Sequence, residues 1–437
     1  MKRITFAALF SALPLATGAA QINDTPFSPP PGSTEFITQS HIRLSLKNYW
    51  KYLKEENQNP KRVHNAWGQG VAMNYQSGYF HDIIGVDADF YGAAKLGASD
   101  YFHSRGVLYS RGSGNKKSNA QGYAKFGQRN LKLKTSLGEA QGQARWGWQK
   151  ISNLGVLTSS TRLSPTTYLG WSGTLRYGAL SLRAAWIDRA MERNTPDTMR
   201  LQTNSGGYLN HIASGDVLWQ RDRLALQYGV GESSDYLRRQ LLLANYALSE
   251  RWRLGAQLYT SEALDAYKAM PVGKRDFDRR ASHYALDLEW KSARWRSKGG
   301  IGYTRAPKKG EVGFYPRHMS KGSRGTFTSM AYAGDDYLRD GEWVLSNLTE
   351  YQIDPTVTLG LTGNIARFSY RGQQVRSGEI NAFARWTPRK DLSLWAMAGP
   401  GWSYKSQGKT PLLTGNHSAR THTLASEVII EYRFDLL

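Results

Sequence analysis

The sequence EAQGQARWGWQKISNLGVLTSSTRLSPTTYLGWSGTLRY, residues 139–177, decides the fold, because two alternating runs flank a polar loop. Successive side chains of a β-strand point to opposite faces. In the first run Gln141, Gln143 and Arg145 share a polar face, and Ala144 and Trp146 share an apolar one. Residues 169–177 alternate in the same way. This pattern fits either a half-buried soluble sheet or a pair of transmembrane strands with lipid outside and water inside.

The N-terminus carries an export signal. Residues 1–20 read MKRITFAALFSALPLATGAA, with two cations, an apolar run and small residues before the expected cleavage after Ala20. The apolar run is too short to cross a bilayer, and the chain has no other run of about 18 apolar residues, so we expect no transmembrane helix. Residues 21–437 are expected to form one barrel domain outside the cytoplasm.

The composition fits a membrane barrel. The chain has no cysteine, 14 Trp, 25 Tyr, 14 Phe and 44 Gly, and its mean hydropathy is −0.55. A barrel combines these values because only alternate strand residues face lipid, while Trp and Tyr collect at the two interfaces. We expect the formal charge of +22 on a surface that meets anionic lipid head groups, including lipopolysaccharide. Nucleic acid is not an expected partner, because the cations alternate with apolar residues instead of clustering.

Short and long connections alternate along the chain. Eight short polar turns lie near residues 79–83, 135–138, 177–179, 220–223, 248–251, 291–294, 352–356 and 387–391. Between them are longer connections at residues 53–65, 97–120, 150–166, 190–212, 262–280, 305–341 and 405–421, and two shorter ones near Glu232 and Arg371. The alternation predicts an all-β, transmembrane antiparallel β-barrel of about 18 strands, with short periplasmic turns and long external loops.

A soluble β-sandwich is the alternative fold. Its inner faces would have to bury Arg145, Arg253, Arg296 and Glu289 without partners, which is costly. A barrel of about 16 to 18 strands encloses water instead, so these side chains stay hydrated. A spanning sheet must also close on itself, because unpaired backbone groups at an open edge are costly in hydrocarbon. The charges on the inner face therefore favour the closed barrel.

The C-terminal segment has the pattern of a closing, lipid-facing strand. One face carries alternating apolar residues, namely Val428, Ile430, Tyr432, Phe434 and Leu436. Such a strand is expected to be recognised by the machinery that assembles outer-membrane barrels. Phe434 is not the final residue, so this motif is incomplete.

Several segments resemble the OprD family of substrate-specific outer-membrane porins. They are AWGQGVAMNYQSGYFHDIIGVDADFYGAAKLG (66–97), NLKLKTSLGEAQGQARWGWQ (130–149), SSTRLSPTTYLG (159–170), KDLSLWAM (390–397) and EYRFDLL (431–437). The resemblance implies an 18-stranded monomeric barrel in the outer membrane of a Gram-negative bacterium. It also implies a pore narrowed by inward-folded loops, including the third. Members admit small carboxylate-bearing solutes by diffusion past a ladder of Arg and Lys, and a chitoporin-like branch admits neutral sugars.

The candidate substrate-binding residues follow from strand faces and from this resemblance. The inward positions of the expected strands carry Arg43, Lys47, Arg145, Arg176, Arg253, Arg296, Lys298 and Arg385. A row of cations at successive depths lowers the barrier for a carboxylate, which Arg can bind through two parallel hydrogen bonds. Arg162 and Ser160 occupy the third loop, where the family places constriction residues. Trp395 faces inward where many members have Arg, and it is a possible stacking surface for a ring-shaped solute. Each inward Arg has an alternative as a structural ion pair with an acid such as Asp87, Glu139 or Glu289.

No enzymatic motif is present. The nine His are dispersed without metal-ligand spacing, and the chain has no G-x-S-x-G elbow or P-loop. His283 and Asp287 share an inward face, but one His on a wet surface is usually only solvated. We therefore expect no catalysis and no cofactor, and passive diffusion of small solutes such as amino acids or aromatic acids. The alternatives are a channel for neutral sugars and a non-conducting barrel that acts as an adhesin through loops such as residues 305–341.

Overall fold

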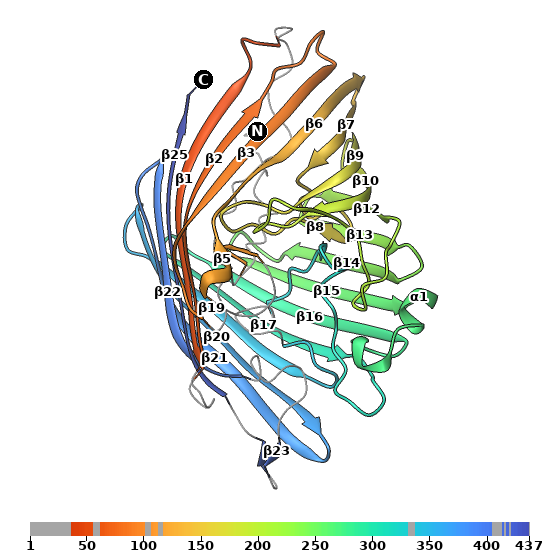
Figure 1. Cartoon of the computed structure of the whole chain (residues 1–437), viewed down its shortest axis with the longest axis vertical. Coiled ribbons are helices and arrows are strands. Elements are labelled where there is room, and N and C mark those ends of the chain that lie inside the picture. Colours follow the sequence, from red (N-terminus) through yellow and green to blue (C-terminus); the bar gives the residue numbers. More distant parts are fainter. Residues whose placement is uncertain are drawn as a thin grey trace.

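A computed structural model describes residues 36–55, 62–100, 106–111, 117–330, 337–403, 413–414, 417–418 and 421–436. Its main feature is one antiparallel sheet that closes on itself (Figure 1). The sheet has 19 strands, but β11 (Thr198–Arg200) pairs only with β10, so 18 strands form the ring. The prediction of about 18 strands is confirmed.

The ring strands follow one another in chain order. They are β1 (His41–Glu55), β2 (Arg62–Gln76), β3 (Ile84–Ala98), β6 (Tyr123–Leu137), β7 (Ala140–Gln149), β9 (Thr167–Tyr177), β10 (Leu180–Met191), β12 (Ile212–Arg221), β13 (Leu224–Ser233), β14 (Leu237–Ala247), β15 (Trp252–Ala263), β16 (Arg280–Lys291), β17 (Trp295–Arg305), β19 (Trp343–Gln352), β20 (Val357–Tyr370), β21 (Gln373–Arg389), β22 (Leu392–Ser403) and β25 (Thr421–Asp435).

Short elements occupy the longer connections. They are β4 (Tyr109–Ser110), η1 (Lys117–Asn119), β5 (Ala120–Gln121), β8 (Leu157–Thr158), α1 (Asp265–Lys268), η2 (Val272–Lys274), β18 (Arg324–Gly325), β23 (Leu413–Thr414) and β24 (His417–Ser418). No helix in the part of the chain that the structure describes is long and apolar enough to cross a bilayer.

The outer wall of the barrel is apolar, as the alternation predicts. Leu286, Ile301, Leu345 and Ile365 are adjacent on four neighbouring strands and are 54%, 41%, 59% and 60% exposed. So many large aliphatic side chains are exposed on a protein surface only where that surface meets an apolar partner. In this barrel that partner is the hydrocarbon of the membrane, and the polar residues between them face the lumen.

The two ends of the barrel differ. The short turns join successive strands at one end, and Gly138 and Gly178 take the positive φ values of 59° and 53° that tight turns require. The ring closes where β25 pairs with β1, with Leu44 opposite Phe434. Both termini of the ring lie at this end (Figure 1). The strand alternation and the turn positions predicted from sequence are therefore confirmed.

Two of the long connections at the other end, residues 150–166 and the described parts of residues 305–341, turn back into the barrel. In the third loop, β8 pairs with β18 of the connection that spans residues 305–341. Tyr315 and Phe327 of that connection join Tyr259 of β15 and Leu157 of the third loop in one buried apolar cluster. The described parts of residues 305–341 are therefore not an exposed surface loop. They pack against the inner wall of β14 to β16 and fill part of the lumen.

Candidate functional site

A cavity of about 2000 Å³ lies between the third loop, residues 150–166, and the short-turn end of the barrel. Its lining includes ten Lys or Arg and seven Asp or Glu side chains. Ser45, Asn74, Gln128, Ser172 and Thr174 add hydroxyl and amide groups. The cavity therefore has a wet and mixed-charge wall with a small excess of cations, as expected of a selective pore and not of a packed interior.

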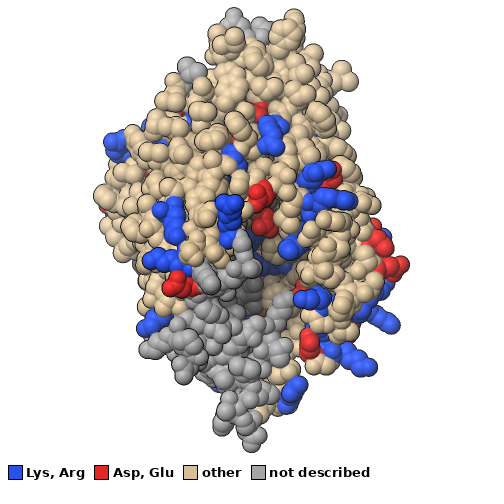
Figure 2. All heavy atoms as spheres, in the orientation of Figure 1, with Lys and Arg blue, Asp and Glu red and all other residues tan. Residues whose placement is uncertain are grey.

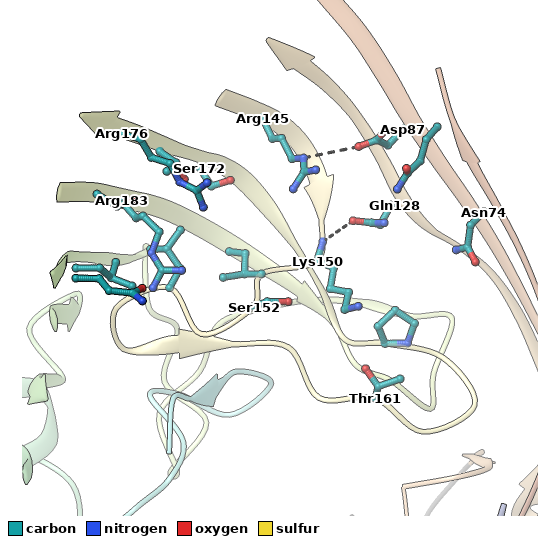
Figure 3. Close-up of a pocket in the computed structure, with 18 of the residues that line it drawn as sticks. Asn74, Asp87, Gln128, Arg145, Lys150, Ser152, Thr161, Ser172, Arg176 and Arg183 are labelled. Atoms are coloured by element: carbon teal, nitrogen blue, oxygen red, sulfur yellow. Dashed lines mark hydrogen bonds and ion pairs between the residues drawn. The ribbon is translucent and has the colours of Figure 1, made fainter. Parts of the chain in front are cut away.

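Three neighbouring strands contribute a basic row. Arg145 of β7, Arg176 of β9 and Arg183 of β10 lie on inward positions, and the third loop adds Lys150 below them (Figure 3). The alternation of strand faces sends these side chains to the same side of the sheet. Arg183 donates from Nε to Asp216 at 2.8 Å, and a guanidinium nitrogen of Arg145 lies 3.7 Å from Asp87. The longer separation leaves Arg145 the more loosely bound of the two.

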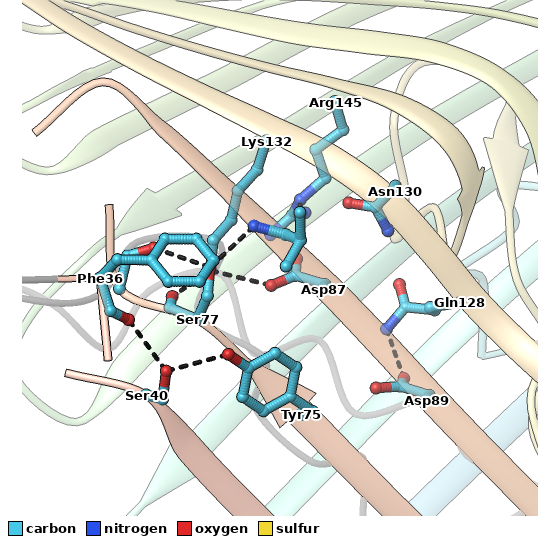
Figure 4. A network of polar contacts seen from close by, with 12 residues as sticks. Phe36, Ser40, Tyr75, Ser77, Asp87, Asp89, Gln128, Asn130, Lys132 and Arg145 are labelled. Atoms are coloured by element: carbon cyan, nitrogen blue, oxygen red, sulfur yellow. Dashed lines mark hydrogen bonds and ion pairs between the residues drawn. The ribbon is translucent and has the colours of Figure 1, made fainter. Parts of the chain in front are cut away.

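An acidic group faces this row from β3. Asp87 accepts a 2.8 Å hydrogen bond from Nζ of Lys132 and is only 4% exposed (Figure 4). Two residues further, Asp89 accepts hydrogen bonds from Tyr91 at 2.8 Å and Gln128 at 2.5 Å. Both carboxylates line the cavity. The wall therefore presents negative as well as positive groups to a solute.

Three cations of β1 are each bound to an acid of β25. Nζ of Lys47 lies 3.2 Å from Glu431, and Nε of Arg43 lies 2.8 Å from Asp435. The adjacent cation, Lys51, lies 2.9 Å from Glu427. The closing seam of the barrel is thus joined by ion pairs as well as by backbone hydrogen bonds.

The inward cations of β15 to β21 are paired in the same way. Glu289 accepts hydrogen bonds from both Arg253 and Arg296, and Arg296 also donates to Glu350 at 3.0 Å. Arg385 lies 3.4 Å from Glu350, and a separate pair joins Lys298 and Asp287 at 3.1 Å. In Figure 2, cations and anions are likewise interspersed on the face that is visible. Most of the predicted inward cations therefore lie in ion pairs with neighbouring acids, as the structural alternative for each Arg predicts.

The predicted residues do not all meet at one place. Arg43, Lys47, Arg145, Arg176 and Arg253 line the cavity together. The lining does not include Arg162, Ser160, Arg296, Lys298, Arg385 or Trp395, which lie elsewhere on the inner wall or in the third loop.

Arg162 fastens the third loop to the wall. Its side chain is 6% exposed and donates to the hydroxyl of Tyr49, and its Nη1 lies 3.3 Å from Glu427. Tyr49 donates to the same carboxylate. Burial acts to lower the pKa of Arg162, but Tyr49 and Glu427 outweigh it and hold that pKa above its usual value. Ser160 is bound within the loop, 3.1 Å from the hydroxyl of Thr166. Both residues therefore hold the third loop in place and do not line the cavity.

Arg193 is a cation that the sequence reasoning missed. It follows β10, and its carbonyl accepts hydrogen bonds from Tyr123 at 2.8 Å and from Ser164 of the third loop at 2.6 Å. Burial, together with the nearby charge of Arg162, lowers the pKa of Arg193 to about 10, so it is charged at neutral pH. In the described part of the chain, no acid lies within ion-pair distance of its guanidinium. Its position in a polar connection without strand periodicity gave no signal in the sequence.

Two other inward residues serve packing. Trp395 contacts the apolar cluster that contains Tyr49 and the one that contains Phe383, so it joins two parts of the wall. His283 is fully buried, with its ring nitrogens 2.9 Å from Thr304 and 2.8 Å from Ser329. Ser329 is also buried, so this His–Ser pair is not exposed to a solute in the lumen. Within the described residues, no group of three or more His, Cys, Asp or Glu could hold a metal ion.

Comparisons with known proteins agree with this geometry. The family model described as outer membrane porin, OprD family, matches residues 34–409. Pseudomonas aeruginosa OccK8 (OprE) is 18% identical with a TM-score of 0.71, covering 92% of this chain and 100% of its own. Acinetobacter baumannii OccAB2 is 18% identical with a TM-score of 0.72, covering 93% of this chain and 100% of its own. Pseudomonas aeruginosa OpdK, solved with vanillate, is 16% identical with a TM-score of 0.70, covering 92% of this chain and 100% of its own. No curated protein sequence matches this chain significantly.

Proposed function

Because this chain belongs to the OprD family of outer-membrane porins, a family of channels and not of enzymes, we propose that it conducts small carboxylate-bearing solutes by passive diffusion. The observation that carries the proposal is the cavity below the third loop. Its ten cations and seven anions leave an excess of positive charge along the path of a solute. A carboxylate therefore meets a lowered electrostatic barrier without a single site that holds it too tightly to leave.

Amino acids suit this wall best among such solutes. Arg145 and Arg176 offer donors to a carboxylate, while Asp87 and Asp89 lie in the same cavity and suit a positively charged amino group. A solute with both charges can exchange water for protein contacts at each end. The paired charges elsewhere on the wall hold the barrel together and add little to selectivity.

The two other candidate functions have less support. Trp395 packs between two apolar clusters, so it is a poor flat surface for a sugar ring. The described parts of residues 305–341 fold into the lumen, which removes the most prominent surface for an adhesin. As further proposals, the barrel acts as a monomer, and its assembly machinery recognises β25.

Planar-bilayer recording in a KCl gradient tests the proposal. The reversal potential should show anion preference, and Arg145→Gln should move the permeability ratio toward unity. Arg145 lines the cavity, and its one acid partner among the described residues, Asp87, lies 3.7 Å away. Arg238→Gln is the matched control, since Arg238 faces outward and pairs with Glu232. A clearly cation-selective channel, or equal effects of both variants, would contradict the role of the basic row. Swelling of liposomes in amino acids, aromatic acids and sugars would then identify the solute class.

A further inference from the structure

One outward row of side chains crosses five neighbouring strands from β16 to β21. The strand registers place Tyr284 opposite Tyr303, Tyr303 opposite Trp343, Trp343 opposite Arg367, and Arg367 opposite Arg376. The aromatic part is continuous, with ring centroids 6.4 Å apart for the two tyrosines and 4.6 Å apart for Tyr303 and Trp343. The row therefore passes from three aromatic rings to two guanidinium groups.

The row lies at the border between hydrocarbon and water. Two positions nearer the middle of each strand is the exposed aliphatic row that contains Ile301, Leu345 and Ile365. On the other side, the β20–β21 hairpin ends at exposed Arg371, opposite the short-turn end of the barrel. Trp and Tyr of membrane barrels collect at this level. The two arginines therefore lie at the depth of the head groups in the outer leaflet.

Arg367 and Arg376 need an anion that the described chain does not supply. Both are exposed and directly opposite each other on paired strands, where like charges destabilise a sheet. No Asp or Glu of the described residues lies within 4 Å of either guanidinium, and other exposed arginines such as Arg238 do have such a partner. An anion placed between the two would convert their repulsion into attraction.

We infer that Arg367 and Arg376 bind a phosphate group of the anionic lipid in the outer leaflet, namely lipopolysaccharide. Two guanidinium groups can each donate parallel hydrogen bonds to phosphate oxygens, which Lys cannot do. The neighbouring Trp343, Tyr303 and Ile365 are placed to contact the acyl chains below that phosphate. The surface is thus apolar on its membrane side and cationic on its external side, and this matches the two parts of lipid A.

Titration of the detergent-purified barrel with lipid A in micelles tests this inference. The double variant Arg367→Gln/Arg376→Gln should bind lipid A about tenfold more weakly, because both phosphate donors are lost. Chemically dephosphorylated lipid A should bind the native barrel as weakly as that variant binds lipid A. The control Arg221→Gln/Arg223→Gln removes two cations at the short-turn end and should bind like the native protein. Equal binding by the double variant, or no effect of dephosphorylation, would overturn the inference.

A charge reversal separates lipid binding from a folding defect. Arg376→Glu places a carboxylate opposite Arg367, so the strand pair gains an ion pair of its own. In lipid-free detergent its unfolding temperature should rise above that of the native barrel, and lipid A should no longer raise it further. A variant that is still stabilised by lipid A as strongly as the native barrel would disprove the phosphate site.

Discussion

Glu427 shows at the scale of one residue how this lumen holds its charges. The carboxylate is 2% exposed, and it accepts hydrogen bonds from Tyr49, Lys51 and Arg162. Breaking a buried ion pair by removing one partner is strongly destabilising, because the other charge remains without compensation. The closing seam between β1 and β25 and the third loop thus depend on the same carboxylate.

A double-mutant cycle measures this dependence. Arg162→Ala and Glu427→Gln should each lower the unfolding temperature in detergent, and their coupling should be about 1–3 kcal/mol, because the two side chains contact each other out of water. The matched cycle is Arg43→Ala with Asp435→Asn, an ion pair at the same seam with side chains that are 46% and 61% exposed. Its coupling should stay below about 1 kcal/mol. Equal coupling in the two cycles would contradict the buried role of Arg162.

The substitution Arg162→Ala should also change solute transport, beyond its effect on the stability of the barrel. Loss of the Arg162 side chain frees the third loop from Tyr49 and should widen the constriction, so current blockade by a permeating solute should become shorter. Recording single-channel blockade by an amino acid, with the outward-facing Arg238→Ala as the control, tests this. Unchanged blockade times in Arg162→Ala would show that the loop is held by its other contacts.

Strand alternation predicted which residues face inward, but it could not predict their partners. Arg145, Arg253 and Arg296 were placed on the inner face by counting odd and even positions, because a strand has a fixed two-residue period. The contacts of Arg162 with Tyr49 and Glu427 span 113 and 265 positions in the sequence, and no local pattern encodes them. Arg193 lies in an irregular connection, where no period applies.

At the scale of elements, one buried arginine helps to hold the connection over residues 305–341. Arg239 of β14 is 1% exposed and donates to the carbonyl oxygens of Pro316 at 2.5 Å, and of Arg317 and His318 at 3.3 Å. Its Nε donates to Ser261 at 2.9 Å. One guanidinium therefore donates to three consecutive backbone carbonyls inside the barrel, and the carbonyl of Arg317 also accepts from the backbone N–H of Gly325 at 2.7 Å.

Arg239→Met should release this connection from the wall. We expect single-channel recordings with larger and noisier currents than those of the native channel, because the freed segment no longer fills its part of the lumen. The neighbouring variant Arg238→Met removes a cation that faces outward and should leave the current unchanged. Quiet recordings of native conductance from Arg239→Met would show that the apolar cluster alone holds the segment.

Little in the sequence indicates that this connection lies inside the barrel. Phe314, Tyr315, Met319 and Phe327 are all buried, but they follow neither a two-residue nor a helical spacing. Periodicity is the main sequence signal for a buried face, so isolated apolar residues in a Gly-rich and Lys-rich stretch read as a surface loop. Their partners, Tyr259 and Leu157, lie on elements far away in the chain.

At the scale of the whole molecule, the barrel should show two different solvents on its two faces. Spin labels along β15 should meet oxygen dissolved in lipid at Leu254, Ala256 and Leu258, and a water-soluble relaxing agent at Arg253. Tyr259 faces inward but is fully buried against residues 305–341, so a label there should meet neither. Labels without a two-residue rhythm, or a stable monomer in water without detergent, would contradict a membrane barrel.

The pairing of β8 with β18 has a consequence for the order of assembly. Thr326 donates to the carbonyl of Leu157, although the two residues are 169 positions apart. The bridge between these two inward connections therefore forms only after residues 324–326 have been made and have entered the barrel. Until then the third loop lacks one of its anchors, so the lumen is completed by segments that are synthesised far apart in time.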